Sequence, residues 1–343
     1  MSWPHFAQQR EPHPVPQEAG DLLAHTDRSQ ANVFAEAHRG RDCPLPLSFG
    51  PTTGVLAPDG SVLYVASQGS LARIDLTTDT VTPVTTPVSI GELVYAADGS
   101  RIYLLGSGQV VSLDTATEAA TPLTVQIAVS VGIALAPNAQ TAHVADRSGS
   151  AVAVVDLHSG TVTAIIPVAV VPQSILANPD GWYVYVTNRY RTSVTVIDTA
   201  TNSVSATIGG LGNYPGPMAL SPDGATLYVA NTSTSWQFSM INTATGQVTG
   251  TTGNEGPTAA LAVNPSGKVL YEIYQEPREV MIEARNAATL APEWTKTLYG
   301  GLAQGSLAIS RDSKYVYFAQ TETDKVFVFD VATRKIIAKI PVG

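Results

Sequence analysis

The densest group of chemically capable side chains in the sequence is Asn188-Arg189-Tyr190-Arg191, where two guanidinium groups flank one aromatic ring. Guanidinium groups pair bidentately with carboxylates and phosphates, and they also stack on planar groups. This segment could therefore hold an anionic or planar ligand. The alternative interpretation is a solvated loop with ordinary surface charges.

A second group of ionisable residues interrupts an apolar stretch between residues 269 and 286. Glu272, Glu283 and Arg285 stand there among Val, Leu, Ile and Tyr. A buried charge needs a partner of opposite sign, and neighbouring strands could let Glu272 or Glu283 pair with Arg285. We interpret the group as a local ion pair or a subunit contact rather than as a catalytic acid.

No short motif identifies a catalytic centre, since a Gly-x-Ser-x-Gly elbow, a His-Glu-x-x-His pair and a phosphate-binding glycine loop are all absent. Four of the six histidines (His5, His13, His25 and His38) lie near the N-terminus, at spacings that fit no compact pair of metal ligands. We therefore expect no metal and no cofactor. A site assembled from single residues on several repeats would leave no such motif.

The elements that must position these residues form an internal repeat. The middle residue of a Pro-Asp-Gly-type turn recurs about every 40 residues, at Asp59, Asp98, Asn138, Asp180, Asp223, Ser266 and Asp312. A second marker keeps the same period at Asp75, Asp114, Asp156, Asp198, Asn242, Asn286 and Asp330. Short runs of Val, Ile, Tyr and Thr between the markers predict strands. The marker side chains are interpreted as turn residues that bond nearby backbone.

A unit of this length with four short strands is typical of a β-propeller blade. Seven units predict an all-β, seven-bladed propeller with four antiparallel strands per blade, built from residues 45–343 as one domain because no blade buries its own faces. Each blade is contiguous in sequence, so packing between blades should close the ring. Residues 1–44 do not repeat and predict a partly helical arm, which either packs on a rim or covers the central channel.

The second strand of each repeat carries a version of one tetrapeptide, complete only at Tyr185-Val186-Thr187-Asn188. Because this motif recurs in register with both turn markers, residues 45–343 resemble the YVTN-repeat (YncE-like) seven-bladed propellers. The resemblance implies the fold, but not one activity, because such folds host binding proteins, lactonases and lyases. His143 takes the tyrosine position of the third repeat, where we expect a strand residue with a satisfied ring nitrogen.

The loops between blades, and those between the second and third strands, should open on one face around the channel, with the marker turns on the other. Polar and aromatic residues on these loops are the default ligand-binding candidates. The loops between blades contribute Glu92, Gln173, Tyr214 and Glu255, and the loops within blades contribute Arg147, Arg189, Tyr190, Arg191, Trp236, Glu276 and Arg278.

The composition narrows the partners. The chain has 343 residues, 44% hydrophobic and only 14% charged, as expected for blades packed on both faces, and its net charge of −9 argues against nucleic acid. No apolar run approaches the roughly 20 residues of a membrane span. With no visible signal peptide and a single cysteine, Cys43, we expect a cytoplasmic location. The oligomeric state stays open.

Two functions remain. The favoured one is a binding or scaffold propeller that engages a small molecule, peptide or glycan at the loop face and central funnel. The alternative is a metal-independent enzyme, lactonase-like, lyase-like or a cyclisation catalyst, with the N-terminal arm as a lid. In that case the arginines and Tyr190 would orient the substrate, and one of Glu92, Glu255 or Glu276 would act as acid or base.

Overall fold

A computed structural model describes residues 53–67, 69–75, 78, 80–232, 236–253, 255–277, 279–300, 307–320 and 325–341. The expected arm, residues 1–44, lies outside these ranges, as do residues 45–52, with which the first blade was expected to begin. Within the described ranges, no helix has the length and apolar character that a membrane span requires.

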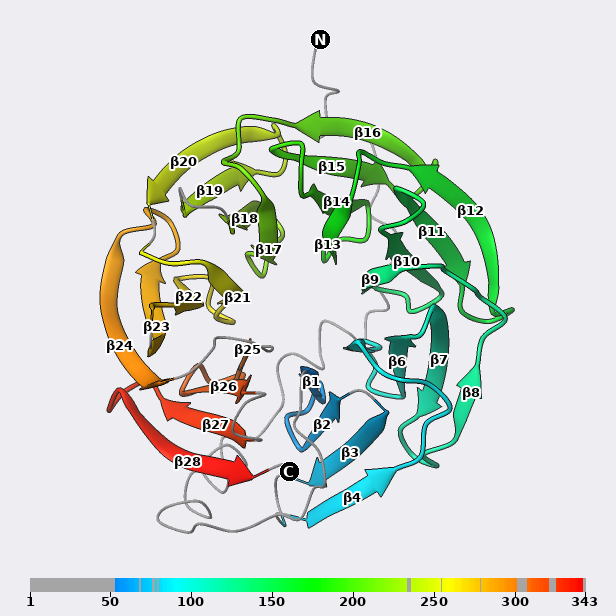
Figure 1. The fold of residues 1–343 in the computed structure, drawn as a ribbon, viewed down its shortest axis with the longest axis horizontal. Helices are drawn as coiled ribbons and strands as arrows, with labels where there is room; N and C mark the ends of the chain where they lie inside the picture. Colours follow the sequence, from blue (N-terminus) through cyan, green and yellow to red (C-terminus); the bar gives the residue numbers. More distant parts are fainter. Residues whose placement is uncertain are drawn as a thin grey trace.

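The described residues form seven sheets, each of four antiparallel strands in sequence order, arranged as blades around a central channel (Figure 1). The predicted fold class is therefore confirmed. The innermost strands β1, β5, β9, β13, β17, β21 and β25 surround the channel, and the fourth strand of each blade lies on the outer rim.

The bounds of the strands follow the repeat. Blades one and two comprise β1 (Thr53–Leu56), β2 (Val62–Ser67), β3 (Ser70–Asp75), β4 (Thr80–Val84), β5 (Glu92–Tyr95), β6 (Arg101–Gly106), β7 (Gln109–Asp114) and β8 (Ala120–Pro122). Blades three and four comprise β9 (Ser130–Leu135), β10 (Thr141–Asp146), β11 (Ala151–Asp156), β12 (Thr161–Pro167), β13 (Pro172–Ala177), β14 (Tyr183–Asn188), β15 (Ser193–Asp198) and β16 (Ser203–Ile208).

The remaining three blades keep this organisation. Blades five and six comprise β17 (Pro215–Leu220), β18 (Thr226–Asn231), β19 (Gln237–Asn242), β20 (Gln247–Gly253), β21 (Thr258–Val263), β22 (Val269–Gln275), β23 (Glu279–Asn286) and β24 (Pro292–Gly300). Blade seven comprises β25 (Leu307–Ile309), β26 (Tyr315–Gln320), β27 (Lys325–Asp330) and β28 (Lys335–Pro341).

Both faces of the central strands are buried, because each blade packs between two neighbours. On β14, Val184 and Val186 pack against blade three, whereas Tyr185 between them packs against blade five. Successive side chains of a strand point to opposite faces, so an uninterrupted apolar run serves two interfaces. This arrangement explains the low content of charged residues.

Packing between the first and last blades closes the ring (Figure 1). This closure was expected because each blade is built from contiguous sequence. Leu63 and Val65 of blade one share a core with Tyr315 and Val328 of blade seven. Fully burying an aliphatic side chain contributes about 1.5–3 kcal/mol, so a few such contacts hold blades one and seven together.

The marker residues are turn residues, as predicted. In blade four, the side chain of Asp198 accepts a hydrogen bond from the backbone N–H of Thr201 at 2.9 Å, and Gly181 has a φ of 75°, which favours glycine. The equivalent bond, from the backbone N–H three residues on, is present in all seven blades, at Asp75, Asp114, Asp156, Asp198, Asn242, Asn286 and Asp330.

Candidate functional site

The two kinds of loop expected on one face are joined by backbone hydrogen bonds. The N–H of Arg189, after β14, donates to the carbonyl of Val171, before β13, at 3.0 Å. The N–H of Thr232 donates in the same way to Tyr214 at 2.9 Å. Equivalent bonds join Arg147 to Val129 and Gln275 to Pro257. We call this side of the ring the loop face, and the side of the marker turns the turn face.

Three of the predicted residues come together where blades four and five meet. The rings of Tyr190 and Tyr214 lie edge to face with centroids 5.6 Å apart, and the Arg189 guanidinium carbon is 5.9 Å from each centroid. Tyr190 is 58% exposed and Tyr214 is 40% exposed. Tyr214 also has a φ of 56°, in the left-handed region that L-residues rarely adopt. The loop therefore holds an aromatic ring toward solvent at some conformational cost.

A second pair lies beside this cluster, where blades three and four meet. Arg147, after β10, donates from Nη2 to the side-chain oxygen of Gln173 on β13 at 3.1 Å. Its Nε is buried, and no hydrogen-bond partner for it occurs among the described residues. Buried donors are almost always paired, so this N–H is an exception that the described protein groups do not satisfy.

Glu92 stands at the channel end of blade two. Its carboxylate accepts a hydrogen bond from the N–H of Ile133 on β9 at 3.0 Å. Burial raises the pKa of Glu92 to about 7, against the lowering effect of that hydrogen bond, although part of the residue stays open. Gly132 lets blades three and four approach closely, because a Cβ there would lie 2.8 Å from the Ile175 side chain of blade four, whereas its 3.5 Å distance from the Glu92 carboxylate would be an ordinary contact.

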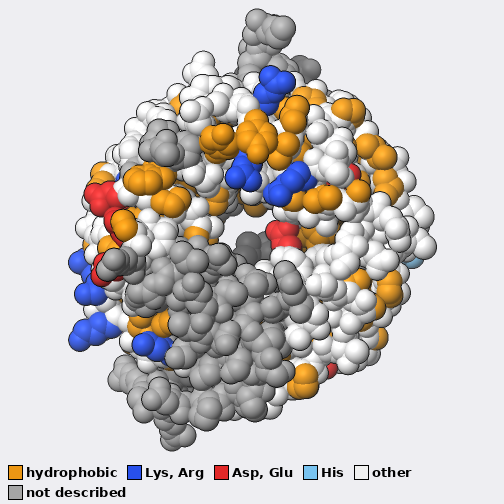
Figure 2. All heavy atoms as spheres, in the orientation of Figure 1, with side chains coloured by type: hydrophobic (Ala, Val, Ile, Leu, Met, Phe, Trp, Pro, Cys, Tyr) orange, Lys and Arg blue, Asp and Glu red, His pale blue; other side chains and the backbone are white. Residues whose placement is uncertain are grey.

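The space-filling view shows this face of the ring (Figure 2). An acidic side chain borders the open channel, with basic and hydrophobic side chains beside it over blades three to five. On the described part of this face, basic, hydrophobic and acidic side chains thus lie near one another beside the channel.

The other predicted candidates are not joined to the Arg189 cluster. Arg191 is exposed, and its N–H bonds to Asn188 at 3.1 Å. Trp236, Glu255 and Glu276 lie on loops of blades five and six, and no hydrogen bond or ion pair links them to Arg189 in the part of the chain that the structure describes. Arg278 lies outside the described residues.

The ion pair predicted in blade six is present. Arg285 lies 2.8 Å from a Glu283 oxygen and 3.8 Å from a Glu272 oxygen, and all three side chains are nearly inaccessible. The hydroxyl of Thr258 donates to Glu272 at 2.5 Å. Burial raises the pKa of Glu283, and Arg285 partly offsets that rise.

This ionic group packs toward blade five rather than into the channel. The Arg285 guanidinium carbon lies 5.1 Å from the centroid of the Phe238 ring on β19, and Nη1 donates to the carbonyl of Leu290 at 3.1 Å. Its contacts are those of a structural element between two blades.

His143 is a strand residue of β10, as expected, but the expectation of a satisfied ring nitrogen was wrong. The residue is 1% exposed, and neither ring nitrogen has a hydrogen-bond partner among the described residues. In the same position of blade five, the longer Tyr228 reaches the Ala287 carbonyl of the next blade at 2.8 Å. The shorter imidazole makes no such bond, and burial lowers its pKa to about 4, so His143 stays neutral near pH 7.

No three His, Cys, Asp or Glu side chains converge on a possible metal position within the described ranges. The four N-terminal histidines lie outside them. The chemistry on the loop face is therefore that of guanidinium groups, phenol rings and one carboxyl with a raised pKa.

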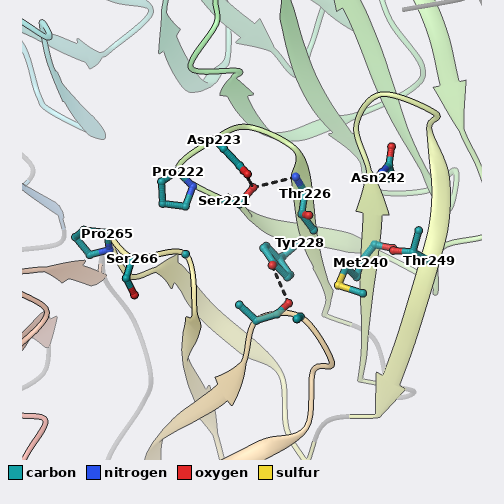
Figure 3. A pocket seen from close by; sticks show the side chains of 13 residues that line it. Ser221, Pro222, Asp223, Thr226, Tyr228, Met240, Asn242, Thr249, Pro265 and Ser266 are labelled. Atoms are coloured by element: carbon teal, nitrogen blue, oxygen red, sulfur yellow. Dashed lines mark hydrogen bonds between the residues drawn. The ribbon is translucent and has the colours of Figure 1, made fainter. Parts of the chain in front are cut away.

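Sequence reasoning missed a pocket on the turn face. This pocket, of about 430 Å³, lies between blades five and six (Figure 3). The sequence did contain a signal for it: Ser266 is the one position of its marker series that is neither Asp nor Asn, and Ala287 follows Asn286 where other blades have larger residues.

Comparison with known proteins agrees with the fold. No protein-family model matches the chain. A segment of 89 residues is 39% identical to the uncharacterized protein YncE of Salmonella typhi, and equally to that of Salmonella typhimurium strain LT2. It covers 26% of this chain and 25% of each relative, so the match spans about a quarter of those proteins.

Two solved structures have the same fold. A chain of Kuenenia stuttgartiensis hydrazine synthase superposes with a TM-score of 0.59 at 19% identity, covering 89% of this chain and 90% of that one. A chain of the mitotic checkpoint complex gives a TM-score of 0.66 at 14% identity, covering 80% and 84%. At such identities the likeness shows the fold alone. The chain is therefore a seven-bladed propeller with a distant, partial similarity to YncE.

Proposed function

We propose that this propeller is a binding protein whose loop face, at blades three to five, takes a planar anionic ligand. One observation carries the proposal: the Arg189 guanidinium lies against two exposed tyrosine rings from separate blades. A cation over a ring forms a partly desolvated surface that can pair with a carboxylate or phosphate and stack on a flat group.

Arg147 supplies a second point of recognition. Gln173 fixes its guanidinium through Nη2, while the buried Nε lacks a protein partner in the described part of the chain. An anionic oxygen at Nε would satisfy that donor, and charge-assisted hydrogen bonds are the stronger kind. The net charge of −9 argues against nucleic acid as the partner. A small molecule, or the end of a peptide or glycan that bears an acid and a flat ring or sugar face, fits this chemistry.

The test compares a planar acid with its uncharged amide by isothermal titration calorimetry. We expect indole-3-acetate to bind and indole-3-acetamide to bind at least about tenfold more weakly, because only the acid pairs with a guanidinium. Arg189→Gln should abolish the preference for the acid. The matched control is Arg101→Gln, which removes an exposed arginine of the turn face that lies 3.9 Å from Asp114. Equal binding of acid and amide would reject the proposal.

An enzymatic function is the second candidate, and Glu92 favours it. A carboxyl with a pKa near 7 is suited to general acid or base chemistry, and Arg147 lies on the neighbouring blade. The corresponding test measures the hydrolysis of simple lactones through the acid that the reaction releases. Turnover that is lost in Glu92→Gln, with folding unchanged, would favour the enzyme. Turnover at the same rate in that variant would exclude Glu92 as the catalyst.

A further inference from the structure

The pocket on the turn face is separate from the loop-face cluster and lies between the turns of two blades (Figure 3). Blade five contributes residues of the β17–β18 turn and of β18 to β20, among them Asp223, Tyr228 and Met240. Blade six contributes its two turns on this face, with Ser266 and Ala287. Its walls are therefore rigid strands and short turns rather than long loops.

A missing hydroxyl leaves this pocket open. In blades two, four and five, a threonine follows the second marker residue, and its hydroxyl donates to the carbonyl of the glycine in the Pro-Asp-Gly-type turn. The distances are 2.8 Å for Thr115, 2.7 Å for Thr199 and 2.7 Å for Thr243. Blade six has Ala287 at this position, so the Gly267 carbonyl lacks that partner. The seven residues at this position are Leu76, Thr115, Leu157, Thr199, Thr243, Ala287 and Val331, of which alanine is the smallest.

Four hydroxyls of the pocket lining donate their protons inside the protein, so they can offer a ligand only acceptor lone pairs, whereas the Asn242 amide and the Thr226 hydroxyl of the lining can also donate. Tyr228 donates to the Ala287 carbonyl at 2.8 Å and Ser221 donates to Asp223 at 2.5 Å (Figure 3). Ser266 donates to Asn264 at 3.1 Å, and Thr249 donates to the Met240 carbonyl at 3.2 Å. A ligand that pairs with the remaining lone pairs must bring its own donors.

The charge of the lining agrees with this conclusion. Among the described residues that line the pocket, Asp223 is the only charged one, and the Ser221 hydroxyl is the main cause that lowers the pKa of its carboxyl. Pro222, Met240 and Pro265 supply apolar surface on either side. The pocket thus combines one carboxylate, several acceptors and an apolar wall.

We propose that this pocket binds a cation carried on an apolar stem, namely an alkylguanidinium or alkylammonium group. Asp223 pairs with the charged head, the hydroxyl and carbonyl oxygens accept its N–H groups, and Met240 and the prolines cover the stem. The same chemistry occurs in a free alkyl amine and in an arginine or lysine side chain of a peptide.

The test measures binding of n-butylguanidinium to the full chain by isothermal titration calorimetry, with n-butylurea as the uncharged isostere. We expect saturable binding of the cation and at least about tenfold weaker binding of the urea. Asp223→Asn should weaken the binding of n-butylguanidinium at least about tenfold. Asparagine keeps the turn, because Asn138 of blade three accepts the backbone N–H of Gln140 at 3.0 Å, just as Asp223 accepts that of Ala225.

The matched control is Asp180→Asn, which makes the same change in the equivalent turn of blade four, outside the pocket lining. It should leave the affinity for n-butylguanidinium unchanged, as should Arg189→Gln on the loop face. Equal losses in Asp180→Asn and Asp223→Asn, tight binding of n-butylurea, or no heat from the cation at millimolar concentration would each overturn the proposal.

Ala287→Thr tests the site by restoring the residue that other blades have. The new hydroxyl takes the Gly267 carbonyl and the added atoms narrow the pocket, so binding of n-butylguanidinium should be lost while the melting temperature holds or rises. Full binding in this folded variant would contradict the proposal. A blocked arginine tripeptide then distinguishes the sources: tighter binding than n-butylguanidinium assigns the site to peptides, and failure to bind while the small cation binds assigns it to free amines.

Discussion

Blades four and six each carry arginine, and the two blades use it in opposite ways. Arg189 of blade four lies on two exposed rings, and no carboxylate lies within ion-pair distance of it in the described part of the chain. Arg285 of blade six is 3% exposed and lies between two carboxylates and the Phe238 ring. The first guanidinium is free to bind an anion, whereas the second already has its anions inside the protein.

The cost of desolvation explains this difference. A buried charge is tolerated only with an opposite charge and hydrogen bonds, and removing one partner leaves the other uncompensated. A surface guanidinium over an aromatic ring gains only about 0.5–1 kcal/mol. Stability should therefore depend strongly on Arg285 and hardly at all on Arg189, whereas ligand binding should show the reverse.

The largest effect is expected from Arg285→Ala. It leaves Glu272 and Glu283 buried opposite each other on adjacent strands, and we expect a loss of about 3–5 kcal/mol in the free energy of unfolding. Urea denaturation followed by tryptophan fluorescence measures it. The control replaces all three residues, Glu272→Leu, Glu283→Leu and Arg285→Met, which should cost far less because no charge stays buried. A mild effect of Arg285→Ala alone would contradict the structural role.

The next largest effect is expected at His143, a buried ionisable residue whose ring nitrogens have no hydrogen-bond partner in the described part of the chain. The unfolded chain binds a proton below pH 6.5, whereas folded His143 does so only near pH 4, so the wild type loses stability as the pH falls through this window. His143→Phe should remove that loss, so its free energy of unfolding should exceed that of the wild type by about 2 kcal/mol near pH 4.5. The melting temperatures of His143→Phe and the wild type should differ more at pH 4.5 than at pH 7.5. A constant difference would indicate that His143 does not titrate as described.

Glu92 resembles Glu283 of blade six in its raised pKa but has no arginine at ion-pair distance among the described residues. Its folded pKa of about 7 exceeds the unfolded value of 4.5, so its stabilising contribution is complete below pH 4.5 and is lost as the pH rises through 7. Glu92→Gln keeps an acceptor for Ile133 and should be more stable than the wild type by about 1–2 kcal/mol at pH 7.5, discounted for partial exposure. The free energies of unfolding of the wild type and Glu92→Gln should converge near pH 4.5. Identical unfolding curves at both pH values would refute the raised pKa.

The smallest effect on stability is expected from Arg189→Gln. Because the side chain is not buried with a counter-charge, the free energy of unfolding should stay within about 0.5 kcal/mol of the wild type. Its effect should appear instead in the preference for indole-3-acetate. A loss of stability similar to that of Arg285→Ala would remove the distinction between the two blades.

The regular parts of the molecule were predictable because their causes are local. Asp198 bonds the backbone three residues on, and Gly181 supplies a positive φ within its own turn. The pairing of Arg285 could also be foreseen, since an arginine and glutamates in one apolar stretch must find each other once buried. These inferences required only neighbouring residues and the repeat.

The contacts between blades could not be predicted in this way. Tyr214 reaches Arg189 through a loop that passes through a left-handed φ, and the bond between Glu92 and Ile133 spans 41 positions. For His143, sequence position identified the strand, but only packing revealed that the ring ends short of the next blade. Such contacts depend on how each loop leaves its strand, which the repeat does not encode.

The sequence by itself determined the number of blades, their strands and the chemistry of their turns, because these follow from hydrophobic alternation and turn residues that recur in one short unit. Only the tertiary structure decided which side chains meet. It brought Arg189, Tyr190 and Tyr214 together on the loop face and opened a pocket at Ala287 on the turn face. Closing the ring places residues from separate repeats side by side, and their mutual distances depend on the packing of whole blades.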